Sequence, residues 1–168
     1  ILKNMECELI LLDVNFNMLQ TGRDKAYDKG WPNQPSWVCS NAEQLPAADM
    51  SKDVYVTAFC MRNVARLESA LREAYRVLKP GGCAILQVPL RLDQNTFEDD
   101  RITDPKERAQ VFGQYDHVRI YGKDYQERLE QIGFQVKMLA YAEQLTSEEQ
   151  TRYAVPANEI IPICTKVN

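Results

Sequence analysis

The chain has 168 residues, and 45% of them are hydrophobic, which is enough to build one folded domain around a sizeable core. Its formal net charge of -4 provides no overall basic field. The composition therefore disfavours nucleic acid as a partner.

The five cysteines are spread singly along the chain, without a C-x-x-C pair, and His117 is the only histidine. This pattern predicts reduced thiols and no structural metal site. We expect a cytoplasmic protein, with the mitochondrial matrix as the alternative in a eukaryote. No apolar run is long enough to predict a transmembrane segment.

The first half of the sequence alternates between strand and helix patterns. A buried strand is expected at residues 8–12, directly before Asp13, and a helix is expected at 17–30, where Gly30 ends it. Further elements are expected as strands at 37–39, 52–60 and 83–89, and as a helix from 67 that ends at Pro80-Gly81-Gly82.

The regular alternation stops at residues 91–120, which are polar. One short helix is expected there, with Asp104 as its cap and Pro105 in its first turn. A helix ending near Gly133 and two strands, at 135–141 and 159–167, complete the chain. Strands that alternate with helices predict a mostly parallel α/β sheet with helices on both faces. We expect a single domain, 1–168, with residues 91–120 as an irregular lid or substrate-side insert.

Polar side chains follow several of the expected strands. Ligands of open α/β sheets bind beyond the carboxyl ends of the strands, so these positions are candidate binding residues. Asp13 could accept hydrogen bonds from two ribose hydroxyls or could cap the next helix. Asn41 could recognise an adenine edge or serve as an ordinary turn residue. Arg62 and Asn63 could face the same cleft or could be capping groups on the surface.

Three segments of the sequence carry a specific resemblance. They are LLDVNFNMLQTGRDKA, NAEQLPAADMSKDVYVTAFCMRNV and ALREAYRVLKPGG. Together they resemble class I S-adenosylmethionine-dependent methyltransferases of a Rossmann-like fold, and most closely the C-methyltransferases of ubiquinone and menaquinone biosynthesis. The resemblance covers roughly residues 8–88, and residues 96–134 are similar to other bacterial class I methyltransferases.

The resemblance implies a cofactor and a set of residues that bind it. S-adenosylmethionine would be the methyl donor and S-adenosylhomocysteine the product. Asp13 would hold the ribose, Met18 would line the adenine pocket, and Asn41 with Ala42 would hold the adenine. Arg62 and Asn63 would face cofactor and substrate. The acceptor would be a quinone precursor or another small molecule.

The sequence also departs from the resembling family. The family's first strand and the glycine-rich turn after it do not occur among the 168 residues, so the expected fold is truncated at its N-terminus. The strand before Asp13 and the strand at 52–60 would then flank an empty central position. We expect these strands to pair directly, a partner chain to supply a strand, or further residues to precede Ile1. A homo-oligomer with strand exchange is one such solution.

Residues 115–121 contain further candidates. In an extended segment Tyr115, His117, Arg119 and Tyr121 would share one side. His117 and Arg119 could then act as catalytic residues that deprotonate or orient a phenol-like substrate. The alternative is a histidine in a surface loop that packs through its tyrosines. The acidic run FEDD is expected to be a solvated surface.

Two functions stay open at this point. The first is methyl transfer from S-adenosylmethionine to a small-molecule acceptor. The second is a non-catalytic binding or assembly module on a truncated methyltransferase scaffold, because a fold alone does not determine an activity.

Overall fold

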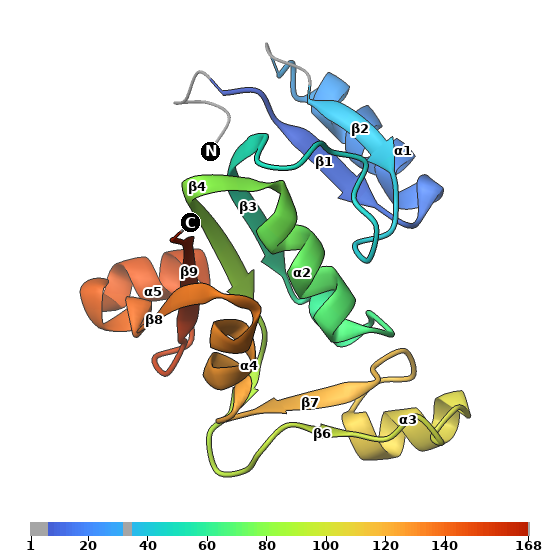
Figure 1. Cartoon of the computed structure of the whole chain (residues 1–168), viewed down its shortest axis with the longest axis vertical. Helices are drawn as coiled ribbons and strands as arrows, with labels where there is room; N and C mark the ends of the chain where they lie inside the picture. The colour runs from blue at the N-terminus through green and yellow to red at the C-terminus, as the bar shows by residue number, and fades with distance from the viewer. Residues whose placement is uncertain (1–6, 32–34, 168) are drawn as a thin grey trace. The chain divides into compact units, whose positions relative to one another are not determined.

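The computed structural model describes residues 7–31 and 35–167 of the chain. Within it the chain divides into two compact units, residues 1–46 and 47–168, and each is described by itself. Figure 1 shows the elements of both units. Among the described residues no helix has the length and apolar character needed to cross a membrane.

The first unit is a βαβ motif. Strand β1 (Ile10–Asp13) pairs in parallel with β2 (Ser36–Cys39), and helix α1 (Phe16–Asp28) connects them. The helix begins where the side chain of Asn15 accepts hydrogen bonds from the next backbone amides. Gly22 of α1 leaves room for the indole of Trp37, since a Cβ at this position would lie 2.9 Å from the ring. Because β1 and β2 run in parallel, their carboxyl ends lie side by side.

The second unit is built on a four-stranded sheet of order β3-β4-β9-β8. Its strands are β3 (Lys52–Ala58), β4 (Leu78–Gln87), β8 (Phe134–Leu139) and β9 (Ile161–Lys166). Strands β3 and β4 are parallel, whereas β9 runs antiparallel to both β4 and β8. The C-terminal strand thus lies between β4 and β8.

Two amphipathic helices pack on this sheet and contact each other. They are α2 (Leu67–Val77) and α4 (Tyr125–Ile132). The buried face of α2 comprises Leu67, Ala70, Leu71, Ala74 and Val77, at the spacing that a helical face requires. The ammonium of Lys166 donates to the carbonyls of Tyr75 and Leu78, so β9 satisfies acceptors at the end of α2.

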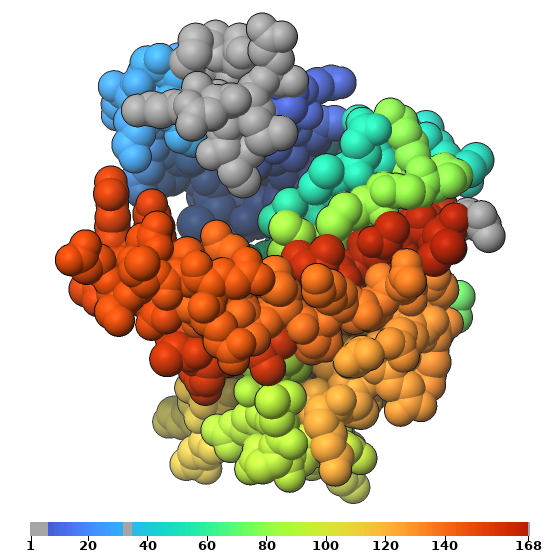
Figure 2. Space-filling model, turned by 90° about the vertical axis from the view of Figure 1, so that its left-hand side faces the viewer, coloured from blue at the N-terminus to red at the C-terminus, as the bar shows by residue number. Residues whose placement is uncertain are grey.

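Residues 90–122 form a second, smaller sheet of order β5-β7-β6. Its elements are β5 (Leu90–Arg91), β6 (Phe97–Glu98), helix α3 (Pro105–Phe112) and β7 (Arg119–Gly122). Three short helices or turns remain, namely η1 (Cys60–Arg62), η2 (Tyr141–Gln144) and α5 (Ser147–Tyr153). In Figure 2 the orange and red atoms of the C-terminal elements form a continuous band across one face of this unit.

The structure confirms most of the expected elements. Helix α3 has Asp104 as its N-cap and Pro105 in its first turn, as predicted. Parallel pairing is confirmed for β1 with β2 and for β3 with β4, while the β8–β9 pair adds antiparallel strands. Residues 91–120 are more regular than expected, because they supply β6 and lead into β7.

Direct pairing of β1 with β3, one of the three arrangements considered from the sequence, is not found among the described residues. In the described part of the chain β1 is hydrogen-bonded to β2, and β3 is hydrogen-bonded to β4. Each sheet therefore has an edge at one of these strands. The side chains of Val54 and Val56 on β3 are 58% and 56% exposed, so this edge strand also presents an apolar surface.

Candidate functional site

Asp13 is the last residue of β1, and only one of its two carboxylate oxygens accepts a hydrogen bond from the described residues. Its Oδ1 accepts a hydrogen bond of 2.7 Å from the backbone N–H of Asn15, while Oδ2 accepts none from the described residues. The cap of α1 is Asn15 rather than Asp13, so the helix-capping alternative for Asp13 is wrong. The half-buried carboxylate of Asp13 is therefore open to hydrogen-bond donors at the end of the strand.

The other first-unit candidates lie at the same edge. Asp13 pairs with Cys39 in the β1–β2 register, and the N–H of Ser40 donates to the carbonyl of Asp13. Asn41 follows directly and starts a turn, with Oδ1 accepting from the N–H of Glu43 at 2.9 Å. Its turn role is thus confirmed, and its amide nitrogen stays open to a ligand. Ala42 is half-buried, and Met18 on α1 is 59% exposed.

In the second unit, the segment after β3 begins with a strained residue. Phe59 has a φ of 63°, in the left-handed region that bulky side chains rarely adopt. Its N–H donates to the carbonyl of Gln87 at the end of β4. The guanidinium of Arg62 lies over the Phe59 ring, 5.1 Å from its centroid, and donates to the Phe59 carbonyl. Arg62 therefore folds back onto its own turn.

Asn63 connects this segment to residues 114–118. Its amide nitrogen donates to Asp116 Oδ2 at 2.9 Å, and the carbonyl of Arg62 accepts from the N–H of Val118. Asp116 Oδ1 is buried and has no hydrogen-bond partner among the residues that the structure describes. His117 is 5% exposed, and its Nδ1 lies 3.3 Å from the carbonyl of Phe112. His117 is thus a buried residue, which corrects the surface-loop alternative.

Arg119 connects β7 to the segment after β3 by hydrogen bonds. Its guanidinium donates to the carbonyls of Met61, Val64 and Ala65, at 2.6 to 3.1 Å. The hydroxyl of Tyr121 also donates to the Met61 carbonyl. Arg119 is 4% exposed, so its donors are used within the protein. This geometry suits a positioning residue better than the substrate contact proposed for it from the sequence.

The expected side-chain alignment of residues 115–121 is found only in part. Arg119 and Tyr121 share the buried side of β7, whereas Tyr115 lies before the strand and is 67% exposed. His117 also precedes the strand. It lies in a turn in which its backbone N–H donates to the carbonyl of Gln114. The turn ends the alternation that an extended segment would have shown.

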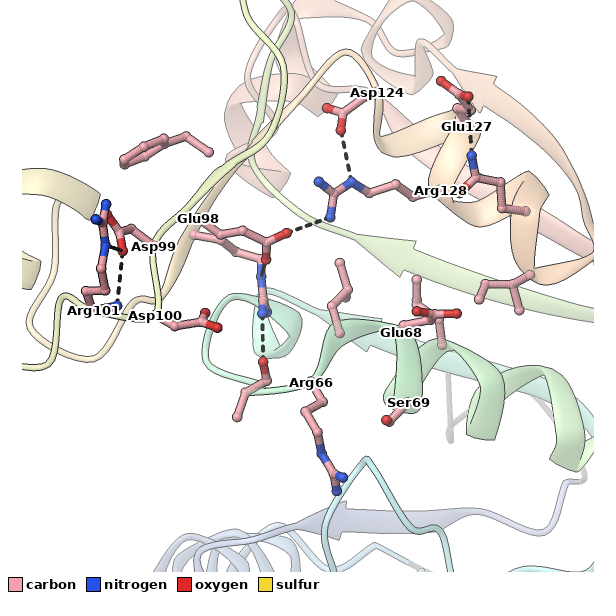
Figure 3. Close-up of a pocket in the computed structure, with 17 residues that line it drawn as sticks. Arg66, Glu68, Ser69, Glu98, Asp99, Asp100, Arg101, Asp124, Glu127 and Arg128 are labelled. Atoms are coloured by element: carbon pink, nitrogen blue, oxygen red, sulfur yellow. Dashed lines mark hydrogen bonds and ion pairs between the residues drawn. The ribbon is translucent and has the colours of Figure 1, made fainter.

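Arg119 also belongs to a network of ion pairs. Glu98 accepts from Arg119 at 3.1 Å and from Arg128 at 2.8 Å, and Arg128 pairs with Asp124 (Figure 3). Partial burial alone would raise the pKa of Glu98, but the hydrogen bonds from Arg128 and Arg119 outweigh it and lower the pKa. The acidic run FEDD is thus not uniformly solvated, since Glu98 pairs with a buried cation.

This network lines a cavity of about 1150 Å³ between the start of α2, β6 and α4. Arg119 is the only sequence-predicted site residue in its lining. The cavity does not lie at the carboxyl ends of β3 and β4, where ligands of such sheets bind.

The second cavity, of about 840 Å³, begins at the carboxyl end of β4. Its lining includes Val88 to Asp93, Ala140, Glu143 and Pro156 to Ile160. The side chain of Gln87, the residue before Val88, donates to Oε1 of Glu159, which lines this cavity. Because Gln87 also accepts from the N–H of Phe59, this cavity adjoins the segment that carries Arg62 and Asn63.

Sequence reasoning missed three of these residues. Gln87 ends a strand, and the rule that selected Asp13 and Asn41 would have selected it too. Asp116 and Glu159 carry no local signal, because their partners are 53 and 72 residues away in the sequence. For metal binding, no group of three or more potential ligands was found in the described part of the chain.

Comparison with known families decides the relationship. The model of the ubiE/COQ5 methyltransferase family matches residues 2–95, which is more than half of the chain. The chain belongs to the ubiE/COQ5 methyltransferase family. The matched range contains Asp13, Met18, Asn41 and Ala42, as well as Arg62 and Asn63. It ends before Asp116, Arg119 and Glu159.

Curated relatives agree with this assignment. The chain is 48% identical over 77 residues to the mitochondrial 2-methoxy-6-polyprenyl-1,4-benzoquinol methylase of Gallus gallus, covering 46% of this chain and 25% of the relative. It is also 48% identical over 77 residues to the ubiquinone/menaquinone biosynthesis C-methyltransferase UbiE of Brucella canis, covering 46% and 29%. The aligned part thus spans about a quarter of the length of these relatives.

Solved structures confirm the Rossmann-like methyltransferase fold over nearly the whole chain. An S-adenosylmethionine-dependent methyltransferase from Mesorhizobium loti aligns with a TM-score of 0.61 and 13% identity, covering 94% of this chain and 80% of that one. The [4+2]-cyclase SpnF aligns with a TM-score of 0.65 and 18% identity, covering 98% and 68%. A fold shared with a cyclase does not by itself establish methyl transfer.

Proposed function

We propose that this chain carries out S-adenosylmethionine-dependent methyl transfer to a small hydroxylated ring, such as a quinone precursor. The observation that carries the proposal is the open carboxylate of Asp13 at the end of β1, within the segment that the family model matches. The names of the relatives support the acceptor class, since they include a benzoquinol methylase.

The residues of the first unit fit the cofactor. Asp13 Oδ2 can accept from ribose hydroxyls, because the described residues leave it without a donor. The amide nitrogen of Asn41 can donate to an adenine nitrogen, since only its oxygen is engaged in the turn. Half-buried Ala42 and exposed Met18 can supply apolar contact to the base.

The second unit, taken by itself, contains a cavity that fits a small acceptor. The cavity at the end of β4 combines apolar residues, including Val88, Leu90 and Ile160, with a few polar groups, as small-molecule sites commonly do. Arg62 and Asn63 would flank it, because Phe59 is hydrogen-bonded to Gln87. Their backbone is fixed by Arg119, which binds the carbonyls of Met61 and Val64.

Little bond chemistry is required from the protein. When bound, S-adenosylmethionine supplies an already electrophilic methyl group. The protein has to bind the acceptor, align it for in-line attack and keep water away. The left-handed backbone of Phe59 and the hydrogen bond from Arg119 to the Met61 carbonyl would hold the segment after β3 in one conformation. A fixed conformation of this segment would help to align the acceptor.

A direct assay tests the proposal. The protein is incubated with S-adenosylmethionine and a short-chain benzoquinol, and the products are analysed by mass spectrometry. We expect the acceptor to gain one methyl group and S-adenosylhomocysteine to form in equal amount. Asp13→Ala should raise the KM for the donor, because it removes a ribose contact. The matched control is Asp28→Ala, which changes an exposed carboxylate at the end of α1.

The assay also separates the second candidate function. Binding of S-adenosylhomocysteine without product would point to a different acceptor. Absence of both product and binding would contradict the proposal and favour a binding or assembly module. That alternative has one observation in its favour, namely the exposed apolar edge strand β3.

A further inference from the structure

Glu159 lies at a position where a carboxylate can meet an acceptor. It is half-buried and lines the cavity at the end of β4. Its backbone is held in a turn in which its N–H donates to the carbonyl of Pro156 at 3.0 Å. The residue therefore has a defined backbone position at the cavity wall.

Gln87 fixes the carboxylate of Glu159. The side-chain nitrogen of Gln87 donates to Oε1 of Glu159, across 72 residues of sequence. Oε2 accepts no hydrogen bond from the described residues. One oxygen is thus used for orientation, and the other is available as an acceptor of a proton or of a hydrogen bond.

The surroundings of Gln87 connect this pair to the proposed transfer site. Gln87 is the last residue of β4 and lies opposite Ala58, the last residue of β3. The carbonyl of Gln87 accepts from the N–H of Phe59 at 3.0 Å. The Glu159 carboxylate is therefore tied to the same sheet edge from which Arg62 and Asn63 emerge.

We propose that Glu159 accepts the proton of an acidic O–H group on the methyl acceptor and that Gln87 is its positioning residue. This inference rests on the proposed methyl transfer. In the step, the carbon–sulfur bond of the donor breaks and its electron pair returns to sulfur. A bond forms from the acceptor to the methyl carbon, and the acceptor's O–H proton moves to Glu159. The neutral thioether, the methylated acceptor and a protonated carboxyl group balance the reaction.

A control residue lies in the same cavity. Glu143 also lines it, but its side chain is exposed and it has no hydrogen bond to Gln87. Glu143→Gln therefore makes the same change in charge as Glu159→Gln without removing the oriented carboxylate. Because glutamine can still bond to Gln87, Glu159→Gln should also keep the fold.

The test compares a phenol with its methyl ether, para-cresol with para-methylanisole, by calorimetry at neutral pH in the presence of S-adenosylhomocysteine. The ether lacks the O–H group that Glu159 would bind. We expect the wild-type protein to prefer the phenol by roughly 10-fold, as for one hydrogen bond to a charged group. Glu159→Gln should lose this preference, and Glu143→Gln should keep it.

Each outcome has one meaning. If Glu159→Gln keeps the phenol preference, or if the wild-type protein shows none, the inference is wrong. If S-adenosylhomocysteine binds to none of the three proteins, the proposed function fails, and that failure is recorded separately from the phenol preference. Where methyl transfer is measurable, kcat of Glu159→Gln should fall about 10²-fold or more with the donor KM unchanged. Equal kcat values in both glutamine variants would contradict the assignment.

Discussion

Individual residues in this chain take their roles from distant partners. Arg119 and His117 lie two residues apart in the sequence but have different surroundings. The guanidinium of Arg119 donates to three backbone carbonyls and to Glu98, whereas the ring of His117 lies within hydrogen-bond distance of one carbonyl, that of Phe112. The spacing of side chains could identify polar residues, but it could not show which donors were already used.

The first prediction concerns Arg119. Arg119→Met should lower the free energy of unfolding by about 1 to 3 kcal/mol, because it leaves buried carbonyls unpaired. Urea unfolding measures this change. The control is Arg101→Met, whose side chain is 90% exposed and pairs with Asp99, and which should change stability little. Equal effects of the two substitutions would show that the Arg119 contacts contribute nothing specific.

The second prediction concerns Glu98 and acid stability. Hydrogen bonds from Arg128 and Arg119 lower the pKa of Glu98 below its ordinary value of 4.5, despite partial burial. The folded state therefore binds fewer protons than the unfolded state in this range. This contribution to stability is present above pH 4.5 and is lost as the pH falls through the lowered pKa.

Urea unfolding at a series of pH values tests this linkage. The wild-type protein should lose stability below pH 4.5 more steeply than Glu98→Gln, which cannot titrate at this position. Identical pH profiles for the two proteins would remove Glu98 from the acid response. The carboxyl group of Asp124 should contribute in the same direction, since its pKa is also lowered, by hydrogen bonds from Thr96 and Arg128 that outweigh its burial.

At the scale of elements, most helices and longer strands could be predicted from local sequence patterns, and the elements that were missed are short. Asp104 and Pro105 marked the start of α3, and the apolar spacing of α2 marked its buried face. Helix α5 was not predicted, although Thr146 and Glu149 form a capping box that is visible as a sequence pattern. The two-residue strands β5 and β6 carry too little periodicity to be recognised.

Strand β3 gives a third prediction, on self-association. It is an edge strand of the described sheet, and Val54 and Val56 are more than half exposed. Long apolar edge strands favour pairing with other chains. We expect the protein to associate as its concentration rises, as analytical ultracentrifugation can measure.

A matched pair of variants tests the role of β3. Val56→Lys should weaken the association, because charged residues on an edge oppose strand pairing. Val167→Lys places the same charge on a side chain that is 55% exposed and lies after β9, and it should have little effect. A protein that stays monomeric throughout, or equal effects of both variants, would contradict the prediction.

For the whole molecule, the sequence was sufficient to predict the fold class, and the family match confirms the resemblance. It was sufficient because three motifs with their spacing lie within residues that the family model covers. The long-range contacts of the second unit could not be predicted in the same way. Gln87, Asp116 and Glu159 meet their partners only after the strands and turns have been assembled.

The central claim is that Asp13 binds the ribose of the methyl donor, and titration calorimetry with S-adenosylhomocysteine tests it most directly. We predict that the wild-type protein binds this ligand and that Asp13→Ala weakens the binding by about 1.5 to 3 kcal/mol, the range for a hydrogen bond to a charged group. Asp28→Ala should bind as the wild-type protein does. Equal affinity in the wild-type protein and Asp13→Ala would exclude Asp13 from the site, and no binding to any of them would contradict the methyltransferase account.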